Sequence, residues 1–293
     1  MGFEQCHPAV NFIYFSTVMA GMVSFQHPAF LIISFVCAWI YHIKRNGWVA
    51  LALQGVLLPA AAAFALYYSS YHHFGVTVLQ KNLIGNAITM ESLVYGAVLG
   101  ITVAGVCHWM CCIWSVFTTD KVVYLFGKAS PRLSLFLAVG LRLGPRVRKE
   151  AKRIHTAQQG IGRGIHQGSV FRRMGNALRI GSMLINWTIE AMITASESMR
   201  SRGSQLRGRT AFSIYRFDNR DRGYVIGQFA CMTLVMMAIL LKQTDVVYDP
   251  RIIITPITPV SYVFYAGYAI FCLMPLMLEC WTEYRFQKAW RSL

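Results

Sequence analysis

The sequence predicts an all-α membrane protein, and its composition and hydrophobic pattern carry that prediction. Hydrophobic residues make up 55% of the 293 residues and charged residues only 14%, whereas a soluble domain carries roughly 25% charged residues. Long apolar runs also alternate with polar segments. We therefore predict a polytopic helical bundle of about six spans, the first two short, with two long cytoplasmic helices.

Six apolar runs supply the expected spans. The first two are short and are separated by Gln26-His27-Pro28, where the proline breaks the helical pattern. The other four approach or exceed the roughly 20 residues that a helix needs to cross the hydrocarbon core. The predicted spans are residues 10–25, 29–43, 48–68, 90–117, 223–241 and 257–280, and a loop with a partial interfacial helix is expected at 69–89. The chain then divides into N-terminal spans (1–117), a cytoplasmic helical domain (118–222) and C-terminal spans (223–293).

The positive charge falls on one side of the predicted membrane. Residues 120–222 hold 20 of the 28 Lys and Arg residues but only 6 of the 12 Asp and Glu residues. If Lys44-Arg45 is cytoplasmic, alternation of the spans leaves only Lys81, Lys242 and Arg251 outside. This is a strong positive-inside signal, and it predicts that both termini are cytoplasmic.

Within the basic segment, capping residues and breakers predict a series of helices. Residues 118–120 are N-cap residues for a short helix that ends at Gly127, and Pro131 opens an apolar helix through Leu143. Gly144-Pro145 then starts an amphipathic helix that ends at the Gly160–Gly164 cluster. Its apolar face includes Ala151 and Ile154.

A second long helix is expected from about Ser169 to Arg202. Four polar residues within it argue against a membrane span, because each is costly in hydrocarbon: Arg179, Asn186, Glu190 and Glu197. Apolar residues at three- and four-residue spacing form one face instead: Ile180, Leu184, Trp187, Ala191 and Ala195. A helix with one apolar face and a basic end suits a groove on a partner protein.

Short motifs in this segment follow one another in a fixed order: Thr118-Thr119-Asp120, Leu141-Arg142-Leu143-Gly144-Pro145, Glu150-Ala151-Lys152-Arg153-Ile154, Ala157-Gln158, Glu197 through Arg202-Gly203, and Arg207-Gly208-Arg209-Thr210. Together with the order of membrane helices, two long helices and further membrane helices, they resemble the T component of the energy-coupling factor transporters. The resemblance covers most of the chain and is densest from 118 to 215.

The resemblance implies a membrane scaffold, not an enzyme, in an importer of a vitamin or other micronutrient in a bacterial or archaeal plasma membrane. Its partners would be two ABC-type ATPases, a small substrate-binding membrane protein (the S component) and the lipid bilayer, with no nucleic acid. ATP and Mg would bind to the ATPases, and this chain would hold no cofactor or metal. No Walker-type phosphate-binding motif occurs in the sequence, since Gly127-Lys128 is followed by Ala129.

The site residues implied by the resemblance are two small-Arg-small triplets that seat in the ATPases. At the second site Ser201-Arg202-Gly203 fits best, with Arg200 a close competitor. At the first site, alignment of the family's triplet without a gap selects Gly160-Ile161-Gly162, so Ile161 stands in the arginine position. A two-residue shift of that alignment selects Gly162-Arg163-Gly164. The S component would contact helix faces at Ala151, Ile154, Leu184, Trp187 and Ala191.

Other interpretations of the same residues stay open. A basic cluster just inside a membrane is often only a topology determinant or a lipid-headgroup contact. A membrane-embedded enzyme acting on lipids would use Cys107-His108-x-x-Cys111-Cys112 for a metal, although packing is the favoured reading of this apolar run. A stand-alone carrier would use Glu91 or Glu279 in a proton path.

Overall fold

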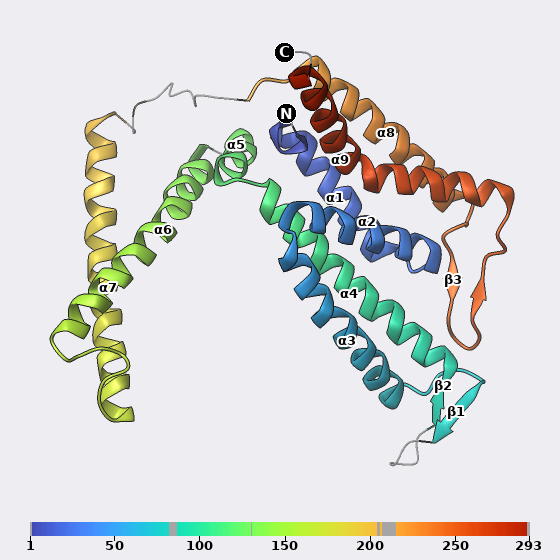
Figure 1. Cartoon of the computed structure of the whole chain (residues 1–293), viewed down its shortest axis with the longest axis horizontal. Coiled ribbons are helices and arrows are strands. Elements are labelled where there is room, and N and C mark those ends of the chain that lie inside the picture. Colours follow the sequence, from blue (N-terminus) through green and yellow to red (C-terminus); the bar gives the residue numbers. More distant parts are fainter. Residues whose placement is uncertain (1, 82–86, 130, 204–205, 207–214, 292–293) are drawn as a thin grey trace. The chain divides into compact units, whose positions relative to one another are not determined.

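The structure is a computed structural model that describes residues 2–81, 87–129, 131–203, 206 and 215–291. It divides into two compact units (Figure 1): unit 1 comprises Met1–Thr118 and Tyr215–Leu293, and unit 2 comprises Thr119–Ile214. Within the described ranges every long element is a helix, and strands form only two short hairpins. The predicted all-α, membrane-type bundle is therefore confirmed, while the count of six spans and their orientation stay predictions.

Four helices of unit 1 are long and apolar enough to cross a membrane: α3 (Trp48–Tyr71), α4 (Met90–Val116), α8 (Asn219–Leu240) and α9 (Pro259–Arg291). They correspond to the four longer predicted spans. The first two predicted spans form α1 (Pro8–Ser24) and α2 (Pro28–Asn46), after a short 3-10 helix, η1 (Phe3–Gln5). Neither α1 nor α2 meets the same length and hydropathy criteria.

The starts of α1 and α2 share one local design, which explains the break between them. Each helix begins at the proline of a His-Pro-Ala sequence, where the missing N–H of proline costs nothing. The Nδ1 atom of the preceding histidine, His7 or His27, accepts a hydrogen bond of 3.2 Å from the alanine N–H. Because proline and the ring cap both favour a helix start, the chain turns at residues 25–27 instead of continuing as one helix.

Small residues bring α3 and α4 into close contact, and Figure 1 shows the two helices side by side. Gly96 and Gly100 form a Gly-x-x-x-Gly pattern on α4 and face Ala65 and Ala61 of α3. A Cβ added at Gly100 would lie 2.9 Å from the Ala61 carbonyl oxygen. This is the small-residue packing by which helices approach one another in membranes.

Residues 69–89 form more regular structure than the sequence predicts. Helix α3 continues through Tyr71, and β1 (Val78–Lys81) then pairs antiparallel with β2 (Ala87–Thr89). The expected partial interfacial helix is therefore wrong for the described part of this stretch. A second hairpin, β3 (Val246–Val247) with β4 (Ile253–Ile254), lies between α8 and α9.

Unit 2 consists of α5 (Thr119–Ala129), α6 (Pro131–Gly160) and α7 (Val170–Ser201). Two predicted breaks are wrong, because α5 continues past Gly127 and α6 runs without interruption through Gly144-Pro145. An interior glycine costs a helix only about 1 kcal/mol and an interior proline about 3 kcal/mol. Contacts of α6 with α5 and α7 can offset these costs. The predicted bounds of α7 agree with the structure to within one residue.

Candidate functional site

Helices α6 and α7 form an antiparallel hairpin, closed by a turn that is tied to both helices. The Gly164 N–H donates to Gln167 Oε1 at 2.9 Å, and Asn176 Nδ2 donates to the Gly164 carbonyl at 3.2 Å. Further along, Gln158 Nε2 donates to Met183 Sδ at 3.6 Å. These contacts fix where α6 ends and how α7 returns along it.

The first predicted triplet lies at the C-terminus of α6. Gly162 has a left-handed backbone with φ +74°, and its N–H donates to the Gln159 carbonyl at 3.1 Å. The Arg163 N–H donates to the Gln158 carbonyl at 2.9 Å. This pair of bonds is a Schellman motif, in which glycine accepts the left-handed conformation that other residues disfavour. Ile161 is the last residue before that glycine, and its side chain is 62% exposed.

The second triplet has an equivalent glycine at the end of α7. Gly203 is left-handed with φ +75°, and its N–H donates to the Arg200 carbonyl at 3.0 Å. Arg202 is the C-cap residue of α7. Residues 161–162 and 202–203 therefore occupy the same positions at two helix ends. Of the two alignments of the first triplet, the one without a gap, Gly160-Ile161-Gly162, matches the geometry of Ser201-Arg202-Gly203. Arg163 lies one residue beyond its glycine and is exposed, and its role in docking stays a prediction.

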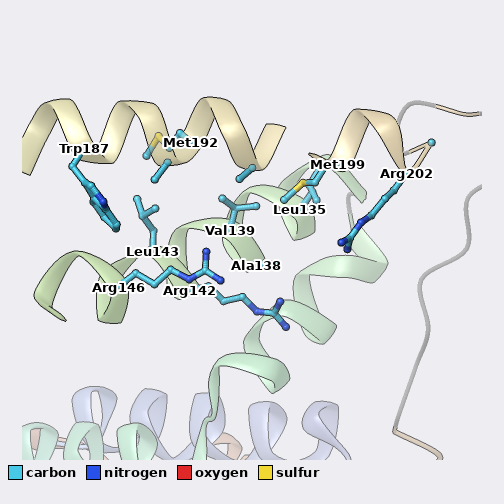
Figure 2. A pocket seen from close by; sticks show the side chains of 13 residues that line it. Leu135, Ala138, Val139, Arg142, Leu143, Arg146, Trp187, Met192, Met199 and Arg202 are labelled. Atoms are coloured by element: carbon cyan, nitrogen blue, oxygen red, sulfur yellow. The ribbon is translucent and has the colours of Figure 1, made fainter. Parts of the chain in front are cut away.

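A hollow of about 600 Å³ lies between the first half of α6 and the second half of α7. Figure 2 shows Arg142 and Arg146 extending from α6, and Arg202 at the end of α7. The other lining side chains are apolar, and no carboxylate is among the lining residues described. The hollow is consequently cationic and apolar at once. Its lining residues are Leu135, Ala138, Val139, Arg142, Leu143, Arg146, Trp187, Ala191, Met192, Ala195, Met199, Arg202 and Gly203.

The residues predicted to contact an S component are half-buried in the structure: Ala151, Ile154, Leu184, Trp187 and Ala191. Two of them, Trp187 and Ala191, line the hollow, which places them on the side of α7 that faces α6. A contact with a partner at these five positions stays a prediction.

A different apolar stripe on α7 is exposed and was missed by the sequence reasoning. Leu178, Ile185 and Ile189 follow one another along the helix and are 71%, 61% and 50% exposed. The signal was present in the sequence as a second set of apolar residues at four- and seven-residue spacing, alongside the set that faces α6.

In unit 1 the histidine of the Cys107–Cys112 run contacts one side chain through each of its ring nitrogens. His108 Nδ1 lies 2.8 Å from His42 Nδ1, and His108 Nε2 lies 2.5 Å from Gln54 Oε1. All three side chains are buried. Among the residues that the structure describes, no three His, Cys, Asp or Glu side chains come together as a metal site.

The two carboxylates considered for a proton path have local partners. Glu91 accepts a hydrogen bond of 2.8 Å from Thr77 Oγ1, next to the β1–β2 hairpin. Glu279 is 6% exposed and lies 3.6 Å from Arg45 Nη1. Arg45 also pairs with Glu4 at 2.9 Å and donates to Ser115 Oγ at 2.9 Å, so it joins η1, α4 and α9. The sequence reasoning used Arg45 only for orientation and missed this structural role.

A scan against protein-family models finds no match for this chain, and a search of curated proteins finds none either.

Proposed function

We propose that this chain is the T component of an energy-coupling factor importer, a membrane scaffold that couples two ABC-type ATPases to a substrate-binding membrane protein. Both termini and unit 2 would then lie in the cytoplasm of a bacterial or archaeal cell, as the positive-inside bias favours. The transported compound would be a vitamin or another micronutrient bound by the S component. ATP and Mg would be held by the ATPases.

The observation that carries the proposal is the matched geometry of the two helix ends. Helices α6 and α7 both end in a left-handed glycine, and the residue just before it is exposed in each case. At the end of α7 this residue is Arg202, whose guanidinium can pair bidentately with a carboxylate in a partner groove. A cation at a helix C-terminus is also favoured by the helix dipole.

Substitution of Arg202 tests the proposal directly. A charge-assisted hydrogen bond contributes about 1.5–3 kcal/mol, so Arg202→Ala should weaken ATPase binding roughly 10- to 150-fold. Co-purification of the ATPases and ATP-dependent uptake should both be lost, while the protein stays in the membrane. Arg179→Ala is the matched control, because Arg179 is exposed on the same helix and lies outside the triplet. Unchanged uptake and unchanged assembly in Arg202→Ala would refute the docking role.

A second candidate is a stand-alone carrier, and the buried His42–His108 pair is the observation that favours it, since ionisable groups inside a membrane bundle are often functional. The two functions separate in proteoliposomes that contain this chain alone. A carrier gives uptake driven by a proton gradient, whereas a T component gives none until the ATPases and the S component are added.

A further inference from the structure

The face of α7 opposite the α6 contact carries an exposed apolar stripe that the docking function does not use. Phe171, Leu178 and Ile185 follow one another at intervals of seven residues, and Ile189 comes four residues later. All four side chains are exposed, that of Phe171 by 85%. Apolar residues at intervals of four and seven form the seam by which one helix packs lengthwise against another. The stripe therefore suits a second helix along about 27 Å of α7.

One flank of this stripe carries four charged residues whose signs divide α7 in two. Arg172 and Arg179 lie in its first half, and Glu190 and Glu197 lie in its second half. Each arginine is followed by a glutamate after about five full helical turns, so all four residues lie on the same side of the helix. All four are exposed, and among the residues that the structure describes none of them forms an ion pair.

This charge pattern is complementary to itself when a second copy of α7 lies antiparallel to the first. A two-fold axis between residues 184 and 185 sets Arg172 opposite Glu197 of the partner subunit, and Arg179 opposite Glu190 of the partner subunit. The same axis keeps the charged flanks of both helices on one side of the pair, so the symmetric contacts form as well. A parallel pair would instead set like charges beside each other, which disfavours it.

The apolar face fits the same antiparallel pairing. Its layers share a midpoint only one residue from the midpoint of the charge pairs, and in two of them a serine on this face lies opposite a larger side chain. The layers are Phe171 opposite Ser196, Leu178 opposite Ile189, and Ser182 opposite Ile185. Alternation of large and small side chains lets two helices interdigitate closely without voids. Charge and shape therefore select one arrangement.

A bilayer surface fits this face of α7 less well than a second helix does. Helices that lie on membranes carry Lys and Arg beside their apolar face, where these residues meet anionic headgroups. Here Glu190 and Glu197 occupy half of the charged flank. The acidic half would repel such a surface, whereas it attracts the basic half of an antiparallel copy.

We propose that this chain forms a two-fold symmetric dimer through the exposed face of α7, with the two copies of the helix antiparallel. The apolar stripe supplies the buried centre of the interface and the four charge pairs supply its rim, which is the usual organisation of a protein–protein interface. The interface uses neither Arg202 nor the left-handed glycines. The proposal is therefore independent of the docking role of the helix ends.

Charge reversal with rescue tests this dimer. Arg172→Glu/Arg179→Glu makes the flank wholly acidic, and Glu190→Arg/Glu197→Arg makes it wholly basic. We expect the wild-type protein to be dimeric by native mass spectrometry of the full-length chain in mild detergent. In each double variant the dissociation constant of the dimer should rise at least about tenfold. An equimolar mixture of the two variants should form a one-to-one heterodimer, because an acidic flank then faces a basic one.

Two further variants separate the interface from general effects of charge and folding. Arg148→Glu/Lys152→Glu is the matched control, since it makes the same change of charge at exposed positions of α6, and it should stay dimeric. Leu178→Ser/Ile185→Ser keeps the charged flank but removes the centre of the stripe. It should lose the dimer while its helical circular dichroism is unchanged.

A monomeric wild-type chain would overturn the proposal, whether lipid or another protein then covers the stripe. Dimers that persist equally in both charge-reversed variants would also overturn it, because another surface would hold them. So would a mixture of the two variants that fails to associate. Binding of the ATPases should be unchanged in all these variants, so loss of the dimer and loss of docking are separate results.

Discussion

The contact between α3 and α4 gives a prediction whose size follows from the structure. In Gly100→Ala the new Cβ would lie 2.9 Å from the Ala61 carbonyl oxygen and 3.0 Å from the Ala61 Cβ. The first distance is about 0.5 Å short of the 3.4 Å at which ordinary contact begins. Because the nearest atoms are backbone or lie next to it, the helices must separate. Overpacking of this kind costs about 1–3 kcal/mol.

A matched control isolates that cost. Gly55→Ala changes the same residue type on α3, where an added Cβ meets nothing within 4 Å. Both substitutions gain helix propensity, by at most about 1 kcal/mol, so the difference between them measures the clash. We expect Gly100→Ala to have a free energy of unfolding about 1–3 kcal/mol below that of Gly55→Ala in reversible detergent denaturation. Equal stability of the two variants would refute close packing of α3 on α4.

Two further predictions concern buried polar groups of unit 1. Arg45→Met should lower the free energy of unfolding by about 3–5 kcal/mol, because it leaves the buried Glu279 carboxylate without its cation. Lys44→Met, which breaks a more exposed pair with Glu283, should lower it by less than about 1 kcal/mol in the same denaturation assay. His108→Leu should cost about 1–3 kcal/mol for each partner left unsatisfied, His42 and Gln54. The double variant with His42→Leu should then cost less than the two single variants together, and a fully additive result would contradict the hydrogen bond between the rings.

Periodicity and composition were sufficient to predict most of the helices. The four long spans are marked by runs of apolar residues, and α7 by its two caps at Ser169 and Arg202. These features are local, so the sequence carries them directly. The breaks predicted at Gly127 and at Gly144-Pro145 were wrong because local propensity is worth only a few kcal/mol. Contacts of α6 with α5 and α7, which a single sequence does not reveal, can offset that cost.

The polar contacts inside unit 1 could not be predicted for a related reason. Arg45 and Glu279 are separated by more than 200 positions in the chain, and the local sequence around either residue does not predict its contact with the other. The same is true of His42, Gln54 and His108, which come from three different helices. By contrast, the glycines at the ends of α6 and α7 were recognisable, since a glycine after an amphipathic run is a helix stop signal.

The equivalence of the two helix ends constrains the partners that the proposed function requires. Both ends have a left-handed glycine after one exposed residue, yet that residue is Ile161 on α6 and Arg202 on α7. An arginine needs a carboxylate or carbonyl partner, whereas an isoleucine gains only from apolar contact. If both ends dock, the groove that receives α6 must therefore be apolar where the groove that receives α7 is acidic. Two identical ATPase surfaces would not satisfy both ends equally, so the proposed function favours a pair of non-identical ATPases or one dominant contact at Arg202.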